Sequence, residues 1–522
     1  RPAPAPMLPA PPVSHYGSLV ASWSPIALVG LLLLAPCAPA PAVVAPSSQS
    51  GSETPARPSE ATPSAEAVST QDPTPTSVEA PFEPPTLHRR TLALVSEATP
   101  AMDEALARIA ARRERNDQVF AKMGGSSVES RAFLHCFSRD RGLNLAEHEA
   151  LRPVLEHFRS GRIGRDDPFE RESLVAQVGW SLRQGLTGRP TRAIQEINAT
   201  RARFALAFWG GNDVQGRNPR RYAERLIQLI ESLEQRGVIP LLAATTPRGD
   251  EPSMDGWARR YNVITRGIAE ALHLPYVDFY AALADLPNRG LAGDGVHHNV
   301  ALDGGRSFPC DFSEERLQRG QNQRNLRTLQ LLGIAHASMQ RGLSAGAEDR
   351  EGETNPSANE DPAAAPNGGS LAAQSAPPRP AANGGGESAP DAALGSEPTP
   401  AAEAQYWIDG VPYSTVVHGE SERASYACEG ADGLTGPERV FHLRIEESVA
   451  LEARLVRGEG TVIFLGRDED GCISRGRNAL SMVLEPGDHR IVVESDEGSE
   501  PILILAEPIT IPDDARRRRR RR

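Results

Sequence analysis

Short apolar runs alternate with amphipathic segments between residues 90 and 344. The apolar runs at 118–123, 203–209, 238–244 and 276–279 predict strands. Hydrophobic positions at helical spacing predict helices over 103–115, 146–159, 220–236, 254–274 and 313–340. Strands that alternate with helices are typical of a parallel sheet covered on both faces. We therefore expect a three-layer, doubly wound α/β domain over 90–344.

The last third of the chain shows a different pattern. Residues 441–445 and 490–493 alternate apolar and polar side chains, and glycine- and aspartate-containing turns such as 485–488 separate such runs. Several short strands with turn signals between them are typical of a β-sandwich. We expect a small all-β sandwich over 405–510.

Two segments, 43–89 and 345–404, consist mainly of Pro, Ser, Thr, Ala, Gly and Glu and contain almost no large apolar residue. Such segments cannot bury enough surface to offset the entropy lost on ordering, so both are predicted to be disordered linkers. The tail 511–522 ends on seven arginines that repel one another, and it is predicted to be disordered as well. With 39% hydrophobic residues overall, the composition excludes a single compact domain, a transporter and a coiled-coil rod.

The apolar block 25–35 is too short to span a bilayer, which takes about 20 residues. Small residues and prolines follow it, as in a secretory signal peptide, which we place at 1–42. We expect an exported protein that is secreted or anchored to the outer envelope. The sequence 34–37 (LAPC) is similar to a lipoprotein box, which makes Cys37 a candidate for lipidation. Plain signal-peptidase cleavage near 40–42 is the alternative.

The formal net charge of −12 argues against a nucleic-acid partner, because a basic face would be needed. Four of the five cysteines fall in the two predicted domains: Cys136 and Cys310 in the first, Cys428 and Cys472 in the second. In an exported protein this placement favours one disulfide per domain. Two buried thiols are the alternative for the first pair.

Polar residues follow the predicted strands. Ser126 follows 118–123, Asn212 follows 203–209, and the sequence 294–297 (DGVH) precedes the last helix. Ligands bind beyond the carboxyl ends of parallel strands, so these residues are expected at one rim. Acyl transfer uses a serine nucleophile, a histidine that takes its proton and a carboxylate that orients the histidine. It also uses an amide that stabilises the oxyanion. These residues therefore indicate acyl-transfer chemistry.

Three motifs in this order resemble the conserved blocks of the SGNH/GDSL hydrolases. They are the sequences 119–137 (VFAKMGGSSVESRAFLHCF), 208–214 (FWGGNDV) and 294–297 (DGVH). The resemblance implies that Ser126 is the nucleophile, His297 the base, Asp294 its orienting carboxylate and Asn212 an oxyanion donor. The family's oxyanion glycine falls best on Gly179. His298, beside His297, has no further ligands at metal-binding spacing, and we interpret it as a solvent-facing neighbour. No metal or cofactor is expected.

The chain departs from the family at Gly125, where the usual residue is Asp. That aspartate helps to hold the nucleophile loop, so its loss puts activity in doubt. The region 405–510 resembles the bacterial pre-peptidase C-terminal domain, on the sequences 436–443 (GPERVFHL), 468–472 (DEDGC) and 484–488 (LEPGD).

The resulting functional hypothesis is an exported serine esterase that hydrolyses carboxylic esters with short acyl or acetyl groups through an acyl-enzyme. An acylated polysaccharide is the substrate class we favour, and the cell envelope is a candidate partner. Two alternatives stay open: a catalytically impaired protein that binds surface glycans, and a carbohydrate O-acyltransferase. The sequence carries no signal for an oligomeric state.

Overall fold

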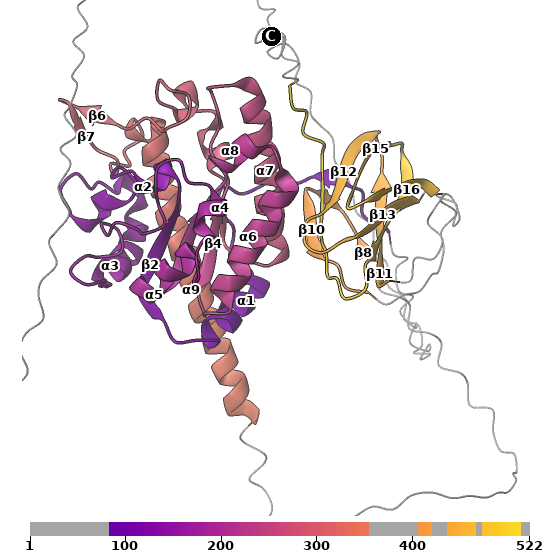
Figure 1. Cartoon of the computed structure of the whole chain (residues 1–522), viewed down its shortest axis with the longest axis horizontal. Helices are drawn as coiled ribbons and strands as arrows, with labels where there is room; N and C mark the ends of the chain where they lie inside the picture. Colours follow the sequence, from indigo (N-terminus) through magenta and orange to yellow (C-terminus); the bar gives the residue numbers. More distant parts are fainter. Residues whose placement is uncertain (1–82, 354–405, 420–435, 466–471, 513–522) are drawn as a thin grey trace, which may run out of the picture. The chain divides into compact units, whose positions relative to one another are not determined.

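A computed structural model describes residues 83–353, 406–419, 436–465 and 472–512 (Figure 1). They form an α/β domain and a set of antiparallel β-sheets, as the hydrophobic pattern predicts. No helix in this part of the chain is long and apolar enough to cross a membrane. The candidate signal at 1–42, Cys37 and the arginine tail lie outside the described residues.

The sheet of the α/β domain contains four parallel strands in the order β2-β3-β4-β5. A parallel bridge between Gly124 and Ala176 adds the segment 175–177 on the other side of β2. After β2 the chain first adds the segment 175–177 on one side of that strand and then adds β3, β4 and β5 on the other side. This change of direction is typical of a doubly wound fold. Both β3 and β4 are buried along their whole length, as expected for strands covered by helices on both faces.

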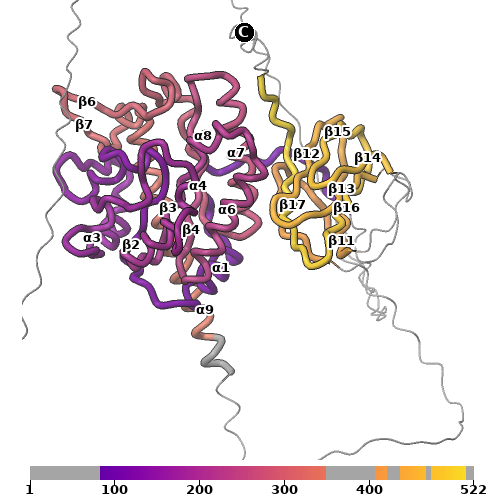
Figure 2. Tube along the Cα trace, in the orientation of Figure 1, coloured from indigo at the N-terminus to yellow at the C-terminus, as the bar shows by residue number. Residues whose placement is uncertain are grey.

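The elements of this domain follow the tube in Figure 2 from indigo to orange. The strands are β2 (Asn116–Gly124), β3 (Ala202–Phe208), β4 (Ile239–Ala243) and β5 (Tyr276–Val277), with an exposed hairpin of β6 (Leu302–Asp303) and β7 (Arg306–Ser307). The helices are α1 (Pro100–Ala111), α2 (Ser126–Glu129), α3 (Arg152–Ser160), α4 (Leu182–Gly185), α5 (Arg192–Thr200), α6 (Pro219–Glu234), α7 (Pro252–Ala271), α8 (Phe279–Ala284) and α9 (Gly320–Glu353).

Two predicted helices begin later than the pattern indicates. In the predicted helix 146–159, residues Ala146–Leu151 form a 3-10 helix, and the α-helix begins only at Arg152. The predicted helix 313–340 begins at Gly320, whose N–H donates to the side chain of Asn299, 2.8 Å away. A Cβ at Gly320 would lie 2.2 Å from the carbonyl oxygen of Gly290, so this helix start needs glycine. Neither contact is visible in the periodicity of the sequence.

The predicted linker boundaries also shift. Helix α9 continues to Glu353, nine residues into the segment assigned to the second linker. At the other boundary, β1 (His88–Arg89) lies within the predicted first linker and pairs in parallel with β9 (Gly410–Val411). Backbone hydrogen bonds to a distant strand order this polar segment, although its composition alone predicts disorder.

The C-terminal region contains two packed sheets, with the strand orders β10-β17-β12-β15 and β14-β13-β16-β11-β8. Apolar side chains of both, among them Leu451, Leu503, Phe441 and Val493, share one buried cluster, as in a β-sandwich. The strands are β8 (Tyr406–Trp407), β10 (Tyr413–Val416), β11 (Glu438–Ile445), β12 (Val449–Leu455), β13 (Gly460–Leu465), β14 (Cys472–Arg477), β15 (Ala479–Leu484), β16 (Gly487–Ser495) and β17 (Ile502–Ala506). Cys428 lies outside the described residues, so its pairing with Cys472 stays a prediction, as does the resemblance to the pre-peptidase domain.

Lys122, the only lysine in the chain, lies inside β2 and is 4% exposed. Its Nζ donates to the carbonyl of Phe169, 2.8 Å away. Burial disfavours the charged ammonium and lowers the pKa of Lys122 to about 8. The unfolded chain, in which a lysine has a pKa of about 10.4, therefore binds a proton that the folded chain lacks between these two values.

We expect the free energy of unfolding to rise by about 2 kcal/mol between pH 7.5 and 9.5, because stability rises with pH wherever the unfolded state binds more protons. Burial raises the pKa of Tyr261 to about 12, whereas an unfolded tyrosine has a pKa of about 10, so tyrosine ionisation opposes this trend weakly at pH 9.5 and strongly above pH 10. Guanidinium unfolding at the two pH values measures the change. In Lys122→Met the rise should be clearly smaller than in the wild type, and an equal rise in variant and wild type would contradict the assignment.

Candidate active site

Ser126, Asn212 and the segment 294–297 lie at the carboxyl ends of the parallel strands. Ser126 is the first residue of α2, two residues beyond the end of β2, and Asn212 lies in the loop that follows β3. Asp294 and His297 lie in the loop between α8 and α9. The fold thus brings together residues up to 171 positions apart in the sequence.

The three side chains form a hydrogen-bonded line. Ser126 Oγ lies 2.9 Å from His297 Nε2, and His297 Nδ1 lies 2.6 Å from Asp294 Oδ2. A hydrogen bond from the imidazole holds the pKa of the Asp294 carboxyl below its usual range, so this carboxylate can only accept. His297 Nδ1 therefore carries the proton, and Nε2 is free to accept from the serine hydroxyl.

The loop of Asp294 is built to hold its carboxylate in place. Oδ1 accepts from the backbone N–H groups of Val296 and His297, each at 2.9 Å. Gly295 has a φ of +68°, and a Cβ there would lie 2.7 Å from the backbone nitrogen of Asp250. The imidazole and the carboxylate are each about half exposed, at 48% and 50%. The His297 ring is thus accessible to solvent while its orientation is fixed.

Asn212 lies directly against the nucleophile loop. Its Nδ2 donates to the carbonyl of Trp180 at 2.8 Å, and a Cβ built on Gly125 would lie only 2.7 Å from the same nitrogen. The neighbouring Asp213 accepts from the N–H groups of Leu182 and Gly210, at 3.1 Å each for the shorter contacts. Asp213 therefore ties the two loops that carry Trp180 and Asn212. Burial raises the pKa of Asp213.

Gly179 is the glycine that the family resemblance assigns to the oxyanion site. It is exposed with a φ of +76°, whereas Trp180, one residue further, lines the pocket beside Ser126. A role for Gly179 as an oxyanion donor stays a prediction. Ser126 is a donor with clearer geometry, because the first N–H of a helix has no partner within that helix.

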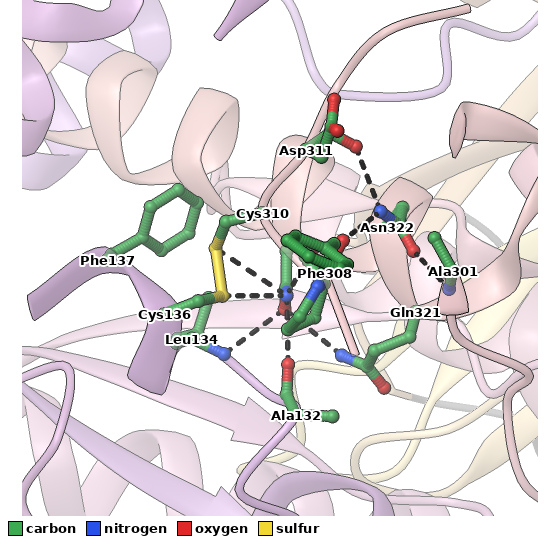
Figure 3. The surroundings of a disulfide bond; sticks show 12 residues. Ala132, Leu134, Cys136, Phe137, Ala301, Phe308, Cys310, Asp311, Gln321 and Asn322 are labelled. Carbon is green, nitrogen blue, oxygen red and sulfur yellow. Dashed lines mark hydrogen bonds between the residues drawn. A yellow bond between two sulfur atoms is a disulfide. The ribbon is translucent and has the colours of Figure 1, made fainter. Parts of the chain in front are cut away.

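Cys136 and Cys310 form a disulfide with Cα atoms 5.8 Å apart, which confirms the predicted pairing (Figure 3). The bond joins the segment after the nucleophile to the segment after His297. Asn325 on α9 reinforces it: its Nδ2 donates to the carbonyls of Ala132 and Pro309, at 2.9 and 3.0 Å. The two loops that carry Ser126 and His297 are thus held together by a covalent bond and a buried amide.

A pocket of about 60 Å³ opens beside Ser126. Its walls come from the ends of β2, β3 and β4, from the start of α8 and from α9. Lining residues include Trp180, Phe208, Trp209, Asn212, Thr245, Thr246, Arg248, Phe279, His298 and Arg324.

The interpretation of His298 as solvent-facing is wrong. Its Nε2 is buried without a hydrogen-bond partner in the described part of the chain, and its Nδ1 lies 3.5 Å from Arg324 Nη1. Sequence analysis missed Arg324 because nothing in the pattern of α9 distinguishes it from the other arginines of that helix. Within the described residues, no three His, Cys, Asp or Glu side chains are grouped as a metal would need.

The sequence profile of the GDSL-like Lipase/Acylhydrolase family matches residues 165–302. The middle region is a GDSL-like lipase/acylhydrolase domain. The matched range contains Asn212, Asp294 and His297 but begins after Ser126. The role of Ser126 as the nucleophile therefore stays a prediction, which rests on the motif at 119–137 and on the contact with His297.

Several solved structures are similar to part of this chain. A GDSL-like lipase from Bacteroides thetaiotaomicron is 14% identical, with 45% of this chain and 100% of that chain covered and a TM-score of 0.28. An acetylxylan esterase from Geobacillus stearothermophilus is 16% identical, with 41% and 93% covered and a TM-score of 0.27. A member of the lipolytic G-D-S-L family from Veillonella parvula is 16% identical, with 41% and 96% covered and a TM-score of 0.26. No curated protein matches the sequence.

Proposed function

We propose that the GDSL-like domain is a serine esterase that hydrolyses carboxylic esters with short acyl groups through an acyl-enzyme on Ser126. The observation that carries the proposal is the hydrogen-bonded line from Ser126 Oγ through His297 to Asp294. A serine hydroxyl is a weak nucleophile until a neighbouring base takes its proton, and His297 Nε2 is placed to do so.

In the acylation step, Ser126 Oγ attacks the ester carbonyl as its proton passes to His297 Nε2. The carbonyl oxygen becomes an oxyanion, for which the Ser126 N–H and the Asn212 amide are candidate donors. An amide nitrogen carries two hydrogens, so Asn212 can keep its bond to Trp180 and donate the second to the oxyanion. Each such donor lowers the barrier by about 3–4 kcal/mol. His297 then gives its proton to the leaving alkoxide.

In the second step a water molecule gives a proton to His297 Nε2 and attacks the acyl-enzyme. The second oxyanion collapses, the bond to Ser126 Oγ breaks, and Oγ recovers the proton from His297. Asp294 stays ionised throughout and stabilises the imidazolium that forms in both steps. The products are the free acid and the alcohol.

The size of the pocket supports a short acyl group. One water molecule needs a cavity volume of roughly 10–15 Å³, so a pocket volume of about 60 Å³ admits only a few heavy atoms. Phe208, Trp209 and Phe279 supply apolar walls to this pocket. A long fatty acyl chain would have to lie outside this pocket.

Gly125 was the feature that favoured a catalytically impaired protein. The close approach of Asn212 Nδ2 and the Trp180 carbonyl gives this glycine a structural reason, because both occupy the space of a side chain. We also propose that the protein is exported. The Cys136–Cys310 disulfide supports this, since such bonds persist in oxidising compartments.

A covalent probe tests the proposal on the full chain. A fluorophosphonate should label one residue, and peptide mapping should place the label on Ser126. Ser126→Ala should abolish labelling, and His297→Ala should slow it. A wild-type protein that neither takes up the probe nor hydrolyses an aryl acetate would overturn the esterase assignment.

A further inference from the structure

The pocket beside Ser126 carries positive charge without a carboxylate. Of its lining residues, Arg248 and Arg324 are cationic, and none is an Asp or Glu. Both arginines are buried, at 5% and 3% exposed. Burying a charged side chain without a partner is costly, so a buried cation is expected to have a paired anion or to bind a ligand.

Arg248 is paired. Its Nε and Nη2 donate to the two carboxylate oxygens of Asp250, at 2.9 and 2.6 Å, and its Nη1 donates to the carbonyl of Gly211. This two-point contact neutralises the guanidinium charge of Arg248 with a carboxylate that does not itself line the pocket.

Arg324 is not paired in this way. Its Nη1 donates to the Ser127 carbonyl at 2.9 Å, and no ion pair to a carboxylate is found for it among the described residues. Its Nε is buried and has no acceptor in that part of the chain. The guanidinium lies 4.7 and 5.0 Å from the ring centres of Phe133 and Phe279, which stabilise a cation only partly.

His298 adds a second unsatisfied donor next to this cation. Because a guanidinium can only donate, its approach to His298 Nδ1 makes that nitrogen the acceptor and leaves the proton on Nε2. This Nε2 is buried and unpartnered within the described residues. Burial and the charge of Arg324 hold the pKa of His298 well below its usual range, so the ring is neutral.

A buried cation and a buried N–H donor that share one pocket need an acceptor with negative charge. The room available is that of a few heavy atoms, and it begins beside the nucleophile. A carboxylate at the far end of a short acyl chain meets each condition: charge, acceptor oxygens and size.

We propose that Arg324 and His298 form a subsite for the distal carboxylate of the acyl group, so that the favoured substrates are half-esters of short dicarboxylic acids such as succinate. This inference rests on the proposed esterase activity and specifies its substrate class. Arg324 is then a specificity-determining residue, and it does not take part in proton transfer.

Two esters of matched shape test the subsite with the full chain. In methyl 4-oxopentanoate a methyl group replaces the charged oxygen of monomethyl succinate. The wild type should favour monomethyl succinate in kcat/KM by about tenfold or more, the effect of one hydrogen bond to a charged group. In Arg324→Met the ratio should fall to about one, and in Arg324→Lys it should be intermediate.

Arg327→Met is the matched control, because Arg327 lies one turn further along α9 and does not line this pocket. It should keep the wild-type ratio. Fluorophosphonate labelling of Arg324→Met shows whether the variant is folded. If it is not, the wild-type ratio decides by itself, and equal turnover of the two esters by the wild type overturns the proposal.

Binding separates this inference from the esterase activity itself. In Ser126→Ala, which cannot turn over, calorimetry should detect monomethyl succinate at least about tenfold more tightly than methyl 4-oxopentanoate. Such binding without wild-type turnover of any ester means that the subsite stands and the esterase assignment fails. If the wild type hydrolyses aryl acetate but neither kinetics nor calorimetry shows a preference for monomethyl succinate, the esterase assignment stands and the subsite fails.

Discussion

Replacing Ser126 or His297 by Ala is expected to lower kcat for a short-chain ester by at least about 10³-fold, and replacing both should cost no more than the worse single change. Without Oγ no acyl-enzyme forms, and without the imidazole Oγ keeps its proton. The two side chains act as one unit through a single 2.9 Å contact, so their effects cannot add. Steady-state kinetics with p-nitrophenyl acetate on the full chain measures all three variants.

Ser160→Ala is a suitable control for this series. Ser160 ends α3, its hydroxyl donates to the His157 carbonyl, and it is not among the residues that line the pocket. Its kcat should match that of the wild type. If the two single losses multiply in the double variant, Ser126 and His297 do not act in one step and the proposed mechanism is wrong.

The sequence predicts where the candidate catalytic residues lie on the fold, because each motif is local. The strand 118–123, the glycines after it and the serine are adjacent in sequence, so hydrophobic pattern and motif locate Ser126 together. The same holds for Asn212 after β3. The structure places Ser126 within hydrogen-bond distance of His297 and Asn212 against Gly125. The parallel arrangement of the strands made this gathering at one rim predictable.

What the sequence could not predict depends on tertiary contacts. His298 was expected to face solvent, but Arg324, from a helix some 26 residues away, packs against it. The late start of α9 depends on Gly290 and Asn299, and β1 is ordered by pairing with a strand more than 300 residues distant. In each case the deciding partner is remote, and no local periodicity records it.

Gly125→Asp, which restores the residue usual in the family, is expected to lower kcat by about 10²-fold or more. A Cβ at this position would lie 2.7 Å from Asn212 Nδ2 and 3.1 Å from the Trp180 carbonyl. The backbone of Gly125 is extended, so the obstacle is space and not strain. The new side chain must displace the Asn212 amide, and loss of one oxyanion donor lowers kcat about 10²–10³-fold.

Three further variants separate this cause from a general distortion of the loop. Asn212→Ala should lose about as much activity as Gly125→Asp, and the double variant should lose little more, because both remove the same donor. Gly216→Ala, in the same loop region but with no atom within 4 Å of the added Cβ, should keep wild-type kinetics. Higher activity in Gly125→Asp would instead mean that glycine impairs this nucleophile loop and that Asn212 makes room for the aspartate. The kcat of Gly125→Asp relative to wild type therefore distinguishes two meanings of the glycine. A lower kcat means that Gly125 makes room for the Asn212 amide, and a higher kcat means that the chain has lost a useful aspartate.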